Sequence, residues 1–418
     1  MKIAFDSPQR KWLVASVAAL VAVAYVGFAA SQFAAAWLGS RAEFTSLQTA
    51  ARLDRGNADY RHALGRYFDI VGRDPASAIT YYNQAVALNP HSARFWFDLS
   101  SAYQVLGDVG NQTRALERAI EADPMTPDVA WEAGNFYLVR GENEKALREL
   151  RVVVADDPTL SEAALQLCWR IQPDAESLLR DVVPARSDSY QALLSLLELK
   201  QDTAGAAKVW DALIRTNEPF EQKQGYEYIR YSILHKDVDQ AVRVWKEIAD
   251  RFKLGPYLPS RENLIVNGNF DLTVLNAGFD WQYSKQSGVH LSFDSSDHHA
   301  GRRSVQIVFD GPGISDAGIY QLVPVQPNTT YSFSGFYKNE EMEGAGGPHF
   351  TIQDAFTQTR FFESEELKNS GFWKSADGEF TTPPDCKLIV LHVRRVPEGS
   401  PMRGTLWIGD FRLTQKPS

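Results

Sequence analysis

Cysteine and clustered basic residues are both scarce in this 418-residue chain. Its two cysteines, Cys168 and Cys386, lie far apart in the sequence, so neither a disulfide framework nor a thiolate zinc site is expected. The 43 Lys and Arg residues are outnumbered by 52 Asp and Glu, which makes the formal net charge −9. Nucleic-acid binding needs clustered Lys and Arg to neutralise phosphates, so we expect no nucleic-acid partner.

The motifs of common catalytic sites are missing as well. No P-loop, no G-x-G-x-x-G and no G-x-S-x-G sequence occurs. The pair His298-His299 is unsuited to joint metal binding, because adjacent strand residues face opposite ways. A glycosidase could use the carboxylates of Glu363, Glu365 and Glu366. A solvated run of charges in a loop is the simpler interpretation of these residues. The sequence therefore predicts a protein that is not an enzyme.

One long apolar run occurs near the N-terminus. Residues 12–40 include no charged side chain, and a bilayer core of about 30 Å needs roughly 20 such residues in a helix. We predict a transmembrane signal-anchor helix at residues 12–38, after a short cytoplasmic N-terminus at residues 1–11. The alternative is a cleavable signal peptide with a small-x-small site at Ala34 and Ala36, although its apolar region is usually shorter.

The charges on the two sides of this run nearly balance. Arg10 and Lys11 lie directly before it and Arg41 lies directly after it, and the immediate flank favours a cytoplasmic N-terminus. We expect a single pass through a bacterial inner membrane, with the soluble domains on the periplasmic side.

A sequence pattern that repeats every 34 residues follows the apolar run. Asn89-Pro90, Asp123-Pro124 and Asp157-Pro158 each end an apolar periodic stretch, and proline stops a helix because it cannot donate the next backbone hydrogen bond. The period resembles that of the tetratricopeptide repeat. The clear units are residues 57–90 (with one extra residue around 74–77), 91–124 and 125–158, and degenerate units continue to residue 253.

Repeat units of this kind cannot bury their apolar faces alone, so successive units must stack. We therefore predict an all-α solenoid over residues 43–253. The resemblance implies a concave groove that binds a protein partner. Aromatic residues at helical spacing are core residues first, so the sequence assigns no groove residue.

The sequence changes character after residue 253. Residues 254–262 contain two prolines and a glycine and are predicted to be a linker. Residues 263–415 alternate between short apolar runs and turn residues, which predicts an all-β sandwich. The predicted fold class is α+β multidomain, with an N-terminal transmembrane helix, an all-α tetratricopeptide repeat solenoid and a C-terminal all-β jelly-roll sandwich.

Four ordered segments of the β region carry a more specific resemblance. Residues 263–271 (Asn-Leu-Ile-Val-Asn-Gly-Asn-Phe-Asp), 299–305, 320–331 and 404–411 resemble strands and turns of carbohydrate-binding modules of the family 4/9 jelly-roll type. The resemblance implies a polysaccharide as partner. These segments are scaffold signatures, so they support the fold more directly than they support sugar contact.

Two acidic residues match positions that help to hold a structural calcium in that family. Asp271 follows the N-G-x-F motif and Asp410 precedes the aromatic residue of the last strand, and oxygen ligands of this kind suit Ca²⁺. The family more often has Glu at the first position and two acids at the last, whereas Gly409 precedes Asp410 here. The alternative is that both carboxylates cap turns and pair with nearby Arg or backbone groups.

Sugar contacts are expected from aromatic rings and polar side chains of the sandwich. His349 and Gln353 share one face of a predicted strand, opposite Phe350 and Ile352, because alternate strand residues face the same way. They are therefore better cleft candidates than Phe350. The candidate carbohydrate-binding residues are Trp281, Tyr283, His349, Gln353 and Arg394.

This combination of modules favours a membrane-anchored, non-enzymatic scaffold of the bacterial envelope. The solenoid would bind a protein partner and the jelly roll a polysaccharide, in glycan biosynthesis or export. One alternative is a pure protein-interaction scaffold whose sandwich has lost glycan binding. A third class, a hydrolase acting through the β domain, requires two carboxylates about 5–10 Å apart in a cleft.

Overall fold

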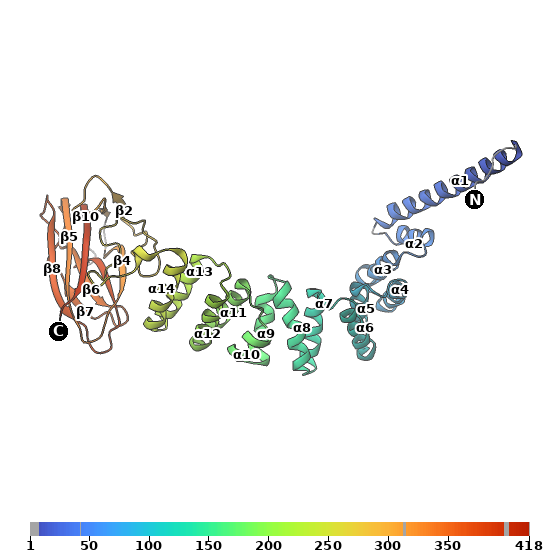
Figure 1. Cartoon of the computed structure of the whole chain (residues 1–418), viewed down its shortest axis with the longest axis horizontal. Coiled ribbons are helices and arrows are strands. Elements are labelled where there is room, and N and C mark those ends of the chain that lie inside the picture. The colour runs from blue at the N-terminus through green and yellow to red at the C-terminus, as the bar shows by residue number, and fades with distance from the viewer. Residues whose placement is uncertain (1–7, 42, 312–314, 397–400, 418) are drawn as a thin grey trace. The chain divides into compact units, whose positions relative to one another are not determined.

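The computed structural model describes residues 8–41, 43–311, 315–396 and 401–417. Residues 1–7 of the predicted cytoplasmic N-terminus lie outside the described residues. The chain divides into two compact units, Met1–Leu196 and Leu197–Ser418, and each is described by itself. Figure 1 shows the order of their elements.

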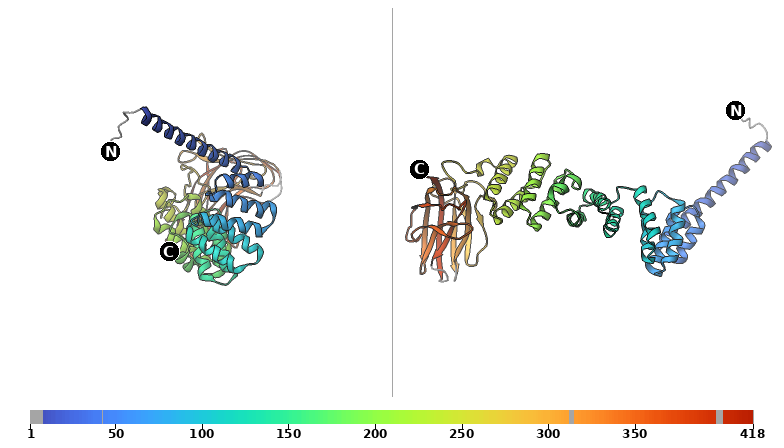
Figure 2. Two further views of the ribbon diagram at one scale, coloured as in Figure 1. Left: turned by 90° about the vertical axis from the view of Figure 1, so that its right-hand side faces the viewer. Right: turned by 90° about the horizontal axis from the view of Figure 1, so that it is seen from below.

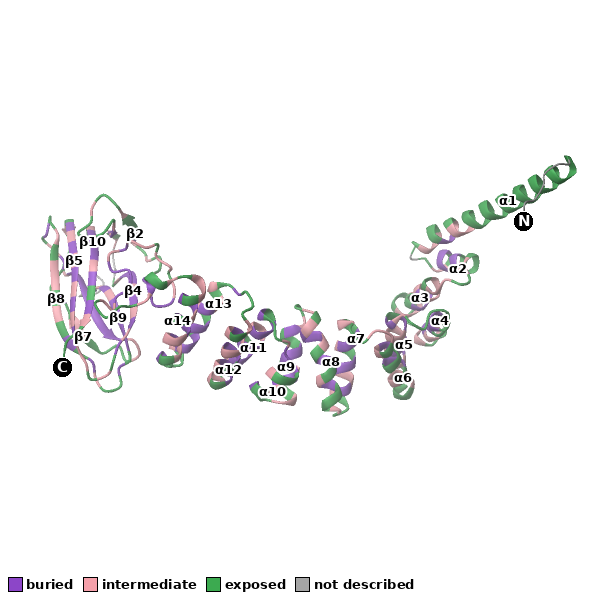
Figure 3. Ribbon diagram, in the orientation of Figure 1, coloured by how far each residue is buried: buried purple, intermediate pink, exposed green. Residues whose placement is uncertain are grey.

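Helix α1 (Pro8–Gly39) covers the apolar run that the sequence predicts to be helical. Its side chains are exposed along most of its length (Figure 3), and near its C-terminal end Ala35 is buried. The helix is long and apolar enough to cross a membrane, and a signal sequence shares both properties.

The remainder of the first unit consists of successive helices that pack in pairs, such as α3 with α4, α5 with α6 and α7 with α8 (Figure 2). Alanines buried between them, such as Ala78 and Ala133, allow the helices to approach closely. The helices are α2 (Phe44–Leu53), α3 (Ala58–Arg66), the π-helical turn η1 (Tyr67–Gly72), α4 (Pro75–Leu88), α5 (Ala93–Leu106), α6 (Val109–Ala122), α7 (Pro127–Val139), α8 (Asn143–Asp156), α9 (Ser161–Ile171), α10 (Ala175–Asp181) and α11 (Ser187–Lys200), which runs across the division.

The extra residue of the first repeat lies in its first helix, not around residues 74–77 as the sequence predicts. Asp74 and Asp108 each cap the start of a second helix through the side chain, and they are one full period apart. The insertion is therefore absorbed before Asp74, by the π-helical turn η1, in which an extra residue widens the helix. Arg73 then adopts the left-handed conformation that Gly107 has in the next repeat, with φ values of 49° and 73°.

The second unit continues from α11 with three helices and a short 3₁₀ turn, and then becomes all-β. The helical elements are α12 (Thr203–Thr216), α13 (Gln222–Leu234), α14 (Val238–Phe252) and η2 (Gly255–Tyr257). The strands are β1 (Gln282–Tyr283), β2 (Val289–Asp294), β3 (Ser304–Gly311), β4 (Asp316–Pro324), β5 (Thr330–Glu343), β6 (Gly347–Asp354), β7 (Arg360–Glu363), β8 (Lys374–Thr381), β9 (Leu388–Val396) and β10 (Met402–Gln415).

These strands form two five-stranded sheets, with antiparallel pairing throughout the described ladders. Sheet A has the order β1-β4-β9-β6-β7, and sheet B has the order β2-β3-β10-β5-β8. Neighbours such as β4 and β9 or β3 and β10 are far apart in sequence, as a jelly-roll arrangement requires, whereas β2-β3 and β6-β7 are consecutive. The predicted fold class, helices followed by an all-β sandwich, is confirmed.

An aromatic cluster between the sheets forms the centre of the sandwich core. The ring of Phe411 lies 5.0 Å from that of Trp281 and 5.1 Å from that of Phe350, between ring centroids. The N-G-x-F motif joins the first segment to the last strand, since the N–H of Phe411 donates to the carbonyl oxygen of Gly268 at 3.0 Å. A Cβ at Gly268 would lie 2.3 Å from the Phe411 carbonyl oxygen, so this position has no room for a side chain.

Candidate functional site

Three neighbouring strands of sheet A, β4, β9 and β6, present polar side chains on the face turned away from the core. The register pairs Asp316 with Arg394, and Arg394 with His349. Further along the same strands Tyr320 pairs with His392. The residues that alternate with them belong to the core. We call this surface the polar face of sheet A; its members are Asp316, Tyr320, His349, Thr351, Gln353, His392 and Arg394.

A cluster of charges organises one end of the polar face. Oδ2 of Asp316 lies 3.2 Å from Nδ1 of His392 and 3.4 Å from Nε of Arg394. Nη1 of Arg394 also donates to Oε1 of Gln353 at 3.4 Å. Burial by itself would raise the pKa of Asp316, but the contact with His392, the backbone N–H of Gly318 and the charge of Arg394 outweigh burial and lower that pKa. A carboxylate is thus held charged beside a guanidinium.

Tyr320 supplies aromatic surface beside this cluster. Its ring centroid lies 5.5 Å from that of His392, and its hydroxyl donates to Oε1 of Gln282 on β1 at 2.9 Å. Burial, and then the charge of Asp316, raise the pKa of Tyr320, so the phenol stays neutral. A flat ring next to charged donors and acceptors can contact both the C–H face and the hydroxyls of a pyranose.

The polar face has an accessible layer and a buried layer. The side chains of Asp316 and Arg394 are 27% and 31% exposed, so they can reach a ligand directly. His349 and Gln353 are buried, and Nδ1 of His349 lies 2.7 Å from the carbonyl oxygen of Ser364. Of these two buried residues, Gln353 contacts the accessible Arg394.

The structure brings together three of the five residues predicted to bind carbohydrate. These are His349, Gln353 and Arg394, on β6 and β9. The predicted residues do not include four other members of the polar face, namely Asp316, Tyr320, Thr351 and His392. Alternation with apolar residues along β4 and β9 marks Asp316, Tyr320 and His392 as outward-facing, but their meeting depends on which strands are neighbours in the sheet.

The other two predicted residues do not join the polar face. Trp281 is 1% exposed in the sandwich core, where its Nε1 donates to the carbonyl oxygen of Asn267 at 3.2 Å. Tyr283 is 39% exposed on the edge strand β1. It alternates with Gln282, which pairs with Tyr320, so the Tyr283 side chain lies on the opposite side of the strand.

Asp271 and Asp410, predicted to hold calcium, are each engaged within the chain. Oδ1 of Asp271 accepts a hydrogen bond from the backbone N–H of Arg302 at 2.5 Å. Asp410 lies 3.1 Å from Nδ1 of His299 and 3.4 Å from Nε of Arg412. Calcium takes six to eight oxygen ligands, and in the described part of the chain no three His, Cys, Asp or Glu side chains group to hold a metal. The calcium site stays a prediction that rests on the family resemblance.

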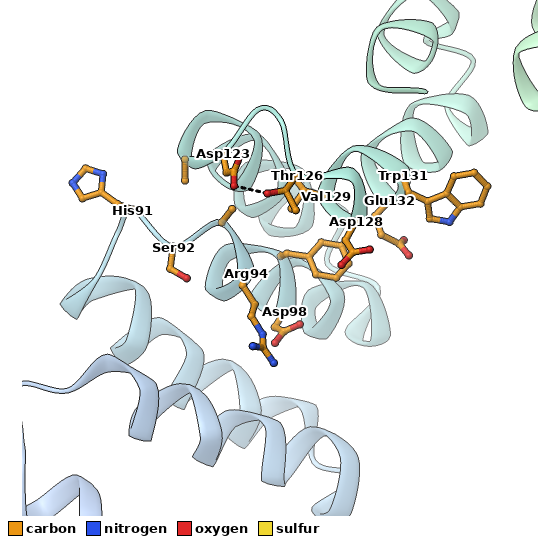
Figure 4. A pocket seen from close by; sticks show the side chains of 13 residues that line it. His91, Ser92, Arg94, Asp98, Asp123, Thr126, Asp128, Val129, Trp131 and Glu132 are labelled. Carbon is orange, nitrogen blue, oxygen red and sulfur yellow. Dashed lines mark hydrogen bonds between the residues drawn. The ribbon is translucent and has the colours of Figure 1, made fainter. Parts of the chain in front are cut away.

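The first unit holds a separate candidate site on its helices. A cavity of about 780 Å³ lies between α5 and α7 (Figure 4), and a second of about 310 Å³ shares Phe97 and Glu132 with it. We call the two together the helical groove. Arg94 lines the larger cavity, and Asn135 and Arg140 line the smaller one, although nothing in the sequence separated these residues from ordinary surface. The acidic residues of the larger cavity are Asp98, Asp123, Asp128 and Glu132.

A protein-family model matches most of the C-terminal module. Residues 262–396 match the model of a family described as a carbohydrate binding domain. This match confirms the predicted resemblance for that part of the chain and supports glycan binding by the module. The resemblance of the helices to tetratricopeptide repeats stays a prediction. Among curated proteins the comparison found no match.

Solved structures resemble parts of the chain. A structure described as "CBM4 structure and function" is 18% identical, covers 36% of this chain and 99% of its own, and has a TM-score of 0.29. The CBM22-1 xylan-binding domain of Xyn10C from Paenibacillus barcinonensis is 13% identical, with 36% and 93% covered and a TM-score of 0.27. A crystal structure of MamA is 21% identical, with 41% and 85% covered and a TM-score of 0.24.

Proposed function

We propose that the C-terminal module binds a glycan on the polar face of sheet A. The match of residues 262–396 to a carbohydrate binding domain carries this proposal. The geometry supports it, because strands β4, β9 and β6 bring together a charged donor, a charged acceptor and an aromatic ring at a partly exposed surface. A sugar ring presents hydroxyl groups and C–H faces, and these three kinds of group can contact both.

The accessible residues have distinct roles in such binding. The guanidinium of Arg394 donates hydrogen bonds and the carboxylate of Asp316 accepts them, so the pair complements hydroxyl groups that do both. Tyr320 provides the surface against which a sugar ring packs. Because Asp316 already holds Arg394 in place at 3.4 Å, little side-chain freedom is lost when a ligand binds.

We further propose that the protein is not an enzyme. Glycoside hydrolysis uses two carboxylates that face one bond. Among the members of the polar face only Asp316 has a carboxylate. Glu363, on the neighbouring strand β7, is paired with Arg360.

In this proposal α1 anchors the protein in a bacterial inner membrane, with both soluble modules on the periplasmic side. The helical groove would hold a segment of a protein partner, and its acidic lining favours a basic segment. Such a scaffold would keep a polysaccharide beside the protein that makes or exports it. The competing possibility is a pure protein-interaction scaffold whose sandwich has lost glycan binding.

Glycan binding by the detergent-solubilised full chain tests the proposal. In affinity electrophoresis through gels containing xylan, hydroxyethyl cellulose, galactan or alginate, we expect one polymer to retard the wild type. Arg394→Ala should weaken that binding about 10-fold or more, because a hydrogen bond to a charged group contributes about 1.5–3 kcal/mol.

Arg403→Ala is the matched control. Arg403 also pairs with an aspartate, at 3.6 Å from Asp310, but its side chain is 78% exposed and it lies on sheet B. This variant should be retarded as strongly as the wild type. If no polymer retards the folded wild type, the glycan function is wrong and the protein-interaction scaffold takes its place.

A C-terminal alkaline phosphatase fusion tests the anchor, because this reporter folds only in an oxidising compartment. The full chain should give activity that sediments with membranes, and deletion of residues 12–38 should abolish it. Activity released into the soluble periplasmic fraction would show instead that the segment is a cleaved signal. Inactive fusions in intact, expressed protein would contradict the periplasmic orientation.

A further inference from the structure

Within the second unit the last helices pack directly on the sandwich. Trp245 of α14 is buried, its Nε1 donates to the carbonyl oxygen of Tyr257 at 3.2 Å, and its ring centroid lies 6.1 Å from that of Phe279. The Tyr257 hydroxyl donates to the carbonyl oxygen of Thr273 at 2.7 Å. The segment 254–262, predicted as a linker, is thus tied to both α14 and the sandwich.

A cavity of about 630 Å³ lies between α13 and sheet A. Its lining comes from three places: α13, the loop 275–278 before β1, and the outward-facing residues of β1 and β4. Ile233, Leu275 and Leu322 make part of it apolar. The charged residues in the lining, all exposed on α13, are Lys223, Glu227 and Arg230.

This cavity is continuous with the polar face of sheet A. Tyr320, the aromatic member of the polar face, also lines the cavity, as does Gln282, which accepts the hydrogen bond of the Tyr320 hydroxyl. Leu322, another lining residue, pairs with Val390, which in turn pairs with Gln353 of the polar face. A ligand that lies on the polar face and extends past Tyr320 therefore enters the cavity.

The chemistry of the lining suits a sugar chain. Tyr226 and Tyr320 offer rings from the helix side and the sheet side, and Glu227, Arg230 and Asn276 offer acceptors and donors around them. Such a mixture of apolar surface with a few charged and amide groups is typical of sites that bind polyhydroxylated ligands. A purely apolar ligand would cover these polar groups without offering them hydrogen bonds.

We propose that a glycan chain bound on the polar face continues into this cavity, so that α13 forms one wall of the binding site. This inference rests on the proposed glycan function and adds to it a helical subsite. The helical region then contributes directly to the length of glycan that the protein recognises, and a trisaccharide and a hexasaccharide should differ in their dependence on α13.

Calorimetry on the detergent-solubilised full chain tests the helical subsite. The probes are tri- and hexasaccharides of β-1,4-linked xylose, glucose, galactose and mannuronate. Arg230→Ala and Glu227→Ala should each weaken hexasaccharide binding about 3- to 10-fold and change trisaccharide binding less than about 2-fold, since one hydrogen bond to a charged group is lost at the far end of the chain. Arg394→Ala should weaken both.

Matched controls remove one charge of each sign from α14, outside the cavity lining. Lys246 and Asp250 are exposed there, so Lys246→Ala and Asp250→Ala should bind both oligosaccharides as the wild type does. If the α13 variants bind the hexasaccharide like the controls while Arg394→Ala still weakens it, the helical subsite is wrong and the sheet site stands. If the folded wild type binds none of these probes, the glycan function is wrong and the subsite with it.

Discussion

Replacing Gly278 with alanine should loosen α14 from the sandwich and lower the free energy of unfolding of the second unit by about 2–5 kcal/mol. Gly278 has φ +60°, and a Cβ there would lie 2.2 Å from Cζ3 of the buried Trp245 ring. The left-handed backbone costs a non-glycine residue about 1–2 kcal/mol. Displacing a packed ring adds about 1–3 kcal/mol. Urea unfolding followed by tryptophan fluorescence measures the loss.

Gly107→Ala separates the two contributions. Gly107 has φ +73° and a Cβ there would meet nothing within 4 Å, so this variant should lose the backbone contribution alone, in the first unit. Limited proteolysis should also cut Gly278→Ala, and not Gly107→Ala, faster than the wild type within residues 254–262. Equal losses in the two variants would contradict the packing that we describe at Trp245.

Asp280→Asn should remove a pH dependence of stability that the wild type shows between pH 4 and 6. Burial raises the pKa of Asp280 from 3.8 to about 6, against hydrogen bonds such as that from the Leu275 N–H, and the residue is 0% exposed. The folded protein therefore binds this proton more tightly than the unfolded chain. Stability falls as pH rises through this window, by about 3 kcal/mol, and stays lower above pH 6. The variant should lack that fall.

Asp294→Asn is the control with the opposite sign. Hydrogen bonds from the Ser296 side chain and backbone and from the Trp407 indole lower the pKa of Asp294 to about 2. This carboxylate therefore stabilises the fold above pH 4 and ceases to do so as pH falls toward 2. Chemical unfolding at a series of pH values compares the two variants with the wild type. If the free energies of unfolding of the wild type and of Asp280→Asn change in parallel from pH 4 to 6, Asp280 is not buried as described.

The Gly278→Ala and Asp280→Asn predictions both concern the junction between the helices α13 and α14 and the sandwich. This junction bears on the glycan site. Burial, and then the charge of Asp280, raise the pKa of Tyr226 on α13 and of Tyr257 on η2. Tyr226 also lines the cavity beside sheet A. A loosened junction should therefore weaken hexasaccharide binding as well as stability, if α13 is a wall of the site.

The candidate site could be predicted from the sequence only in part. Alternation along 347–354 correctly places His349 and Gln353 on the face opposite Phe350 and Ile352, because side chains alternate in any strand. The same rule cannot show that Asp316 lies beside Arg394, since the two strands are separated by β5 to β8 in the chain. Trp281 was a wrong choice for a surface contact, because a large ring in a sandwich serves the core as readily as a ligand.

Local sequence patterns were enough to predict the long apolar helix, the 34-residue period of the helical region, and the β-sandwich with its family resemblance. These features follow from the local spacing of apolar, glycine and proline residues, which does not depend on the segments packed against them. The three-dimensional structure was needed to show which polar residues share the face of sheet A, that the extra residue of the first repeat lies in η1, and that α13 and β4 line one cavity. Pairing between distant strands, and the packing of a helix beside a sheet, depend on complementary surfaces that no local pattern encodes.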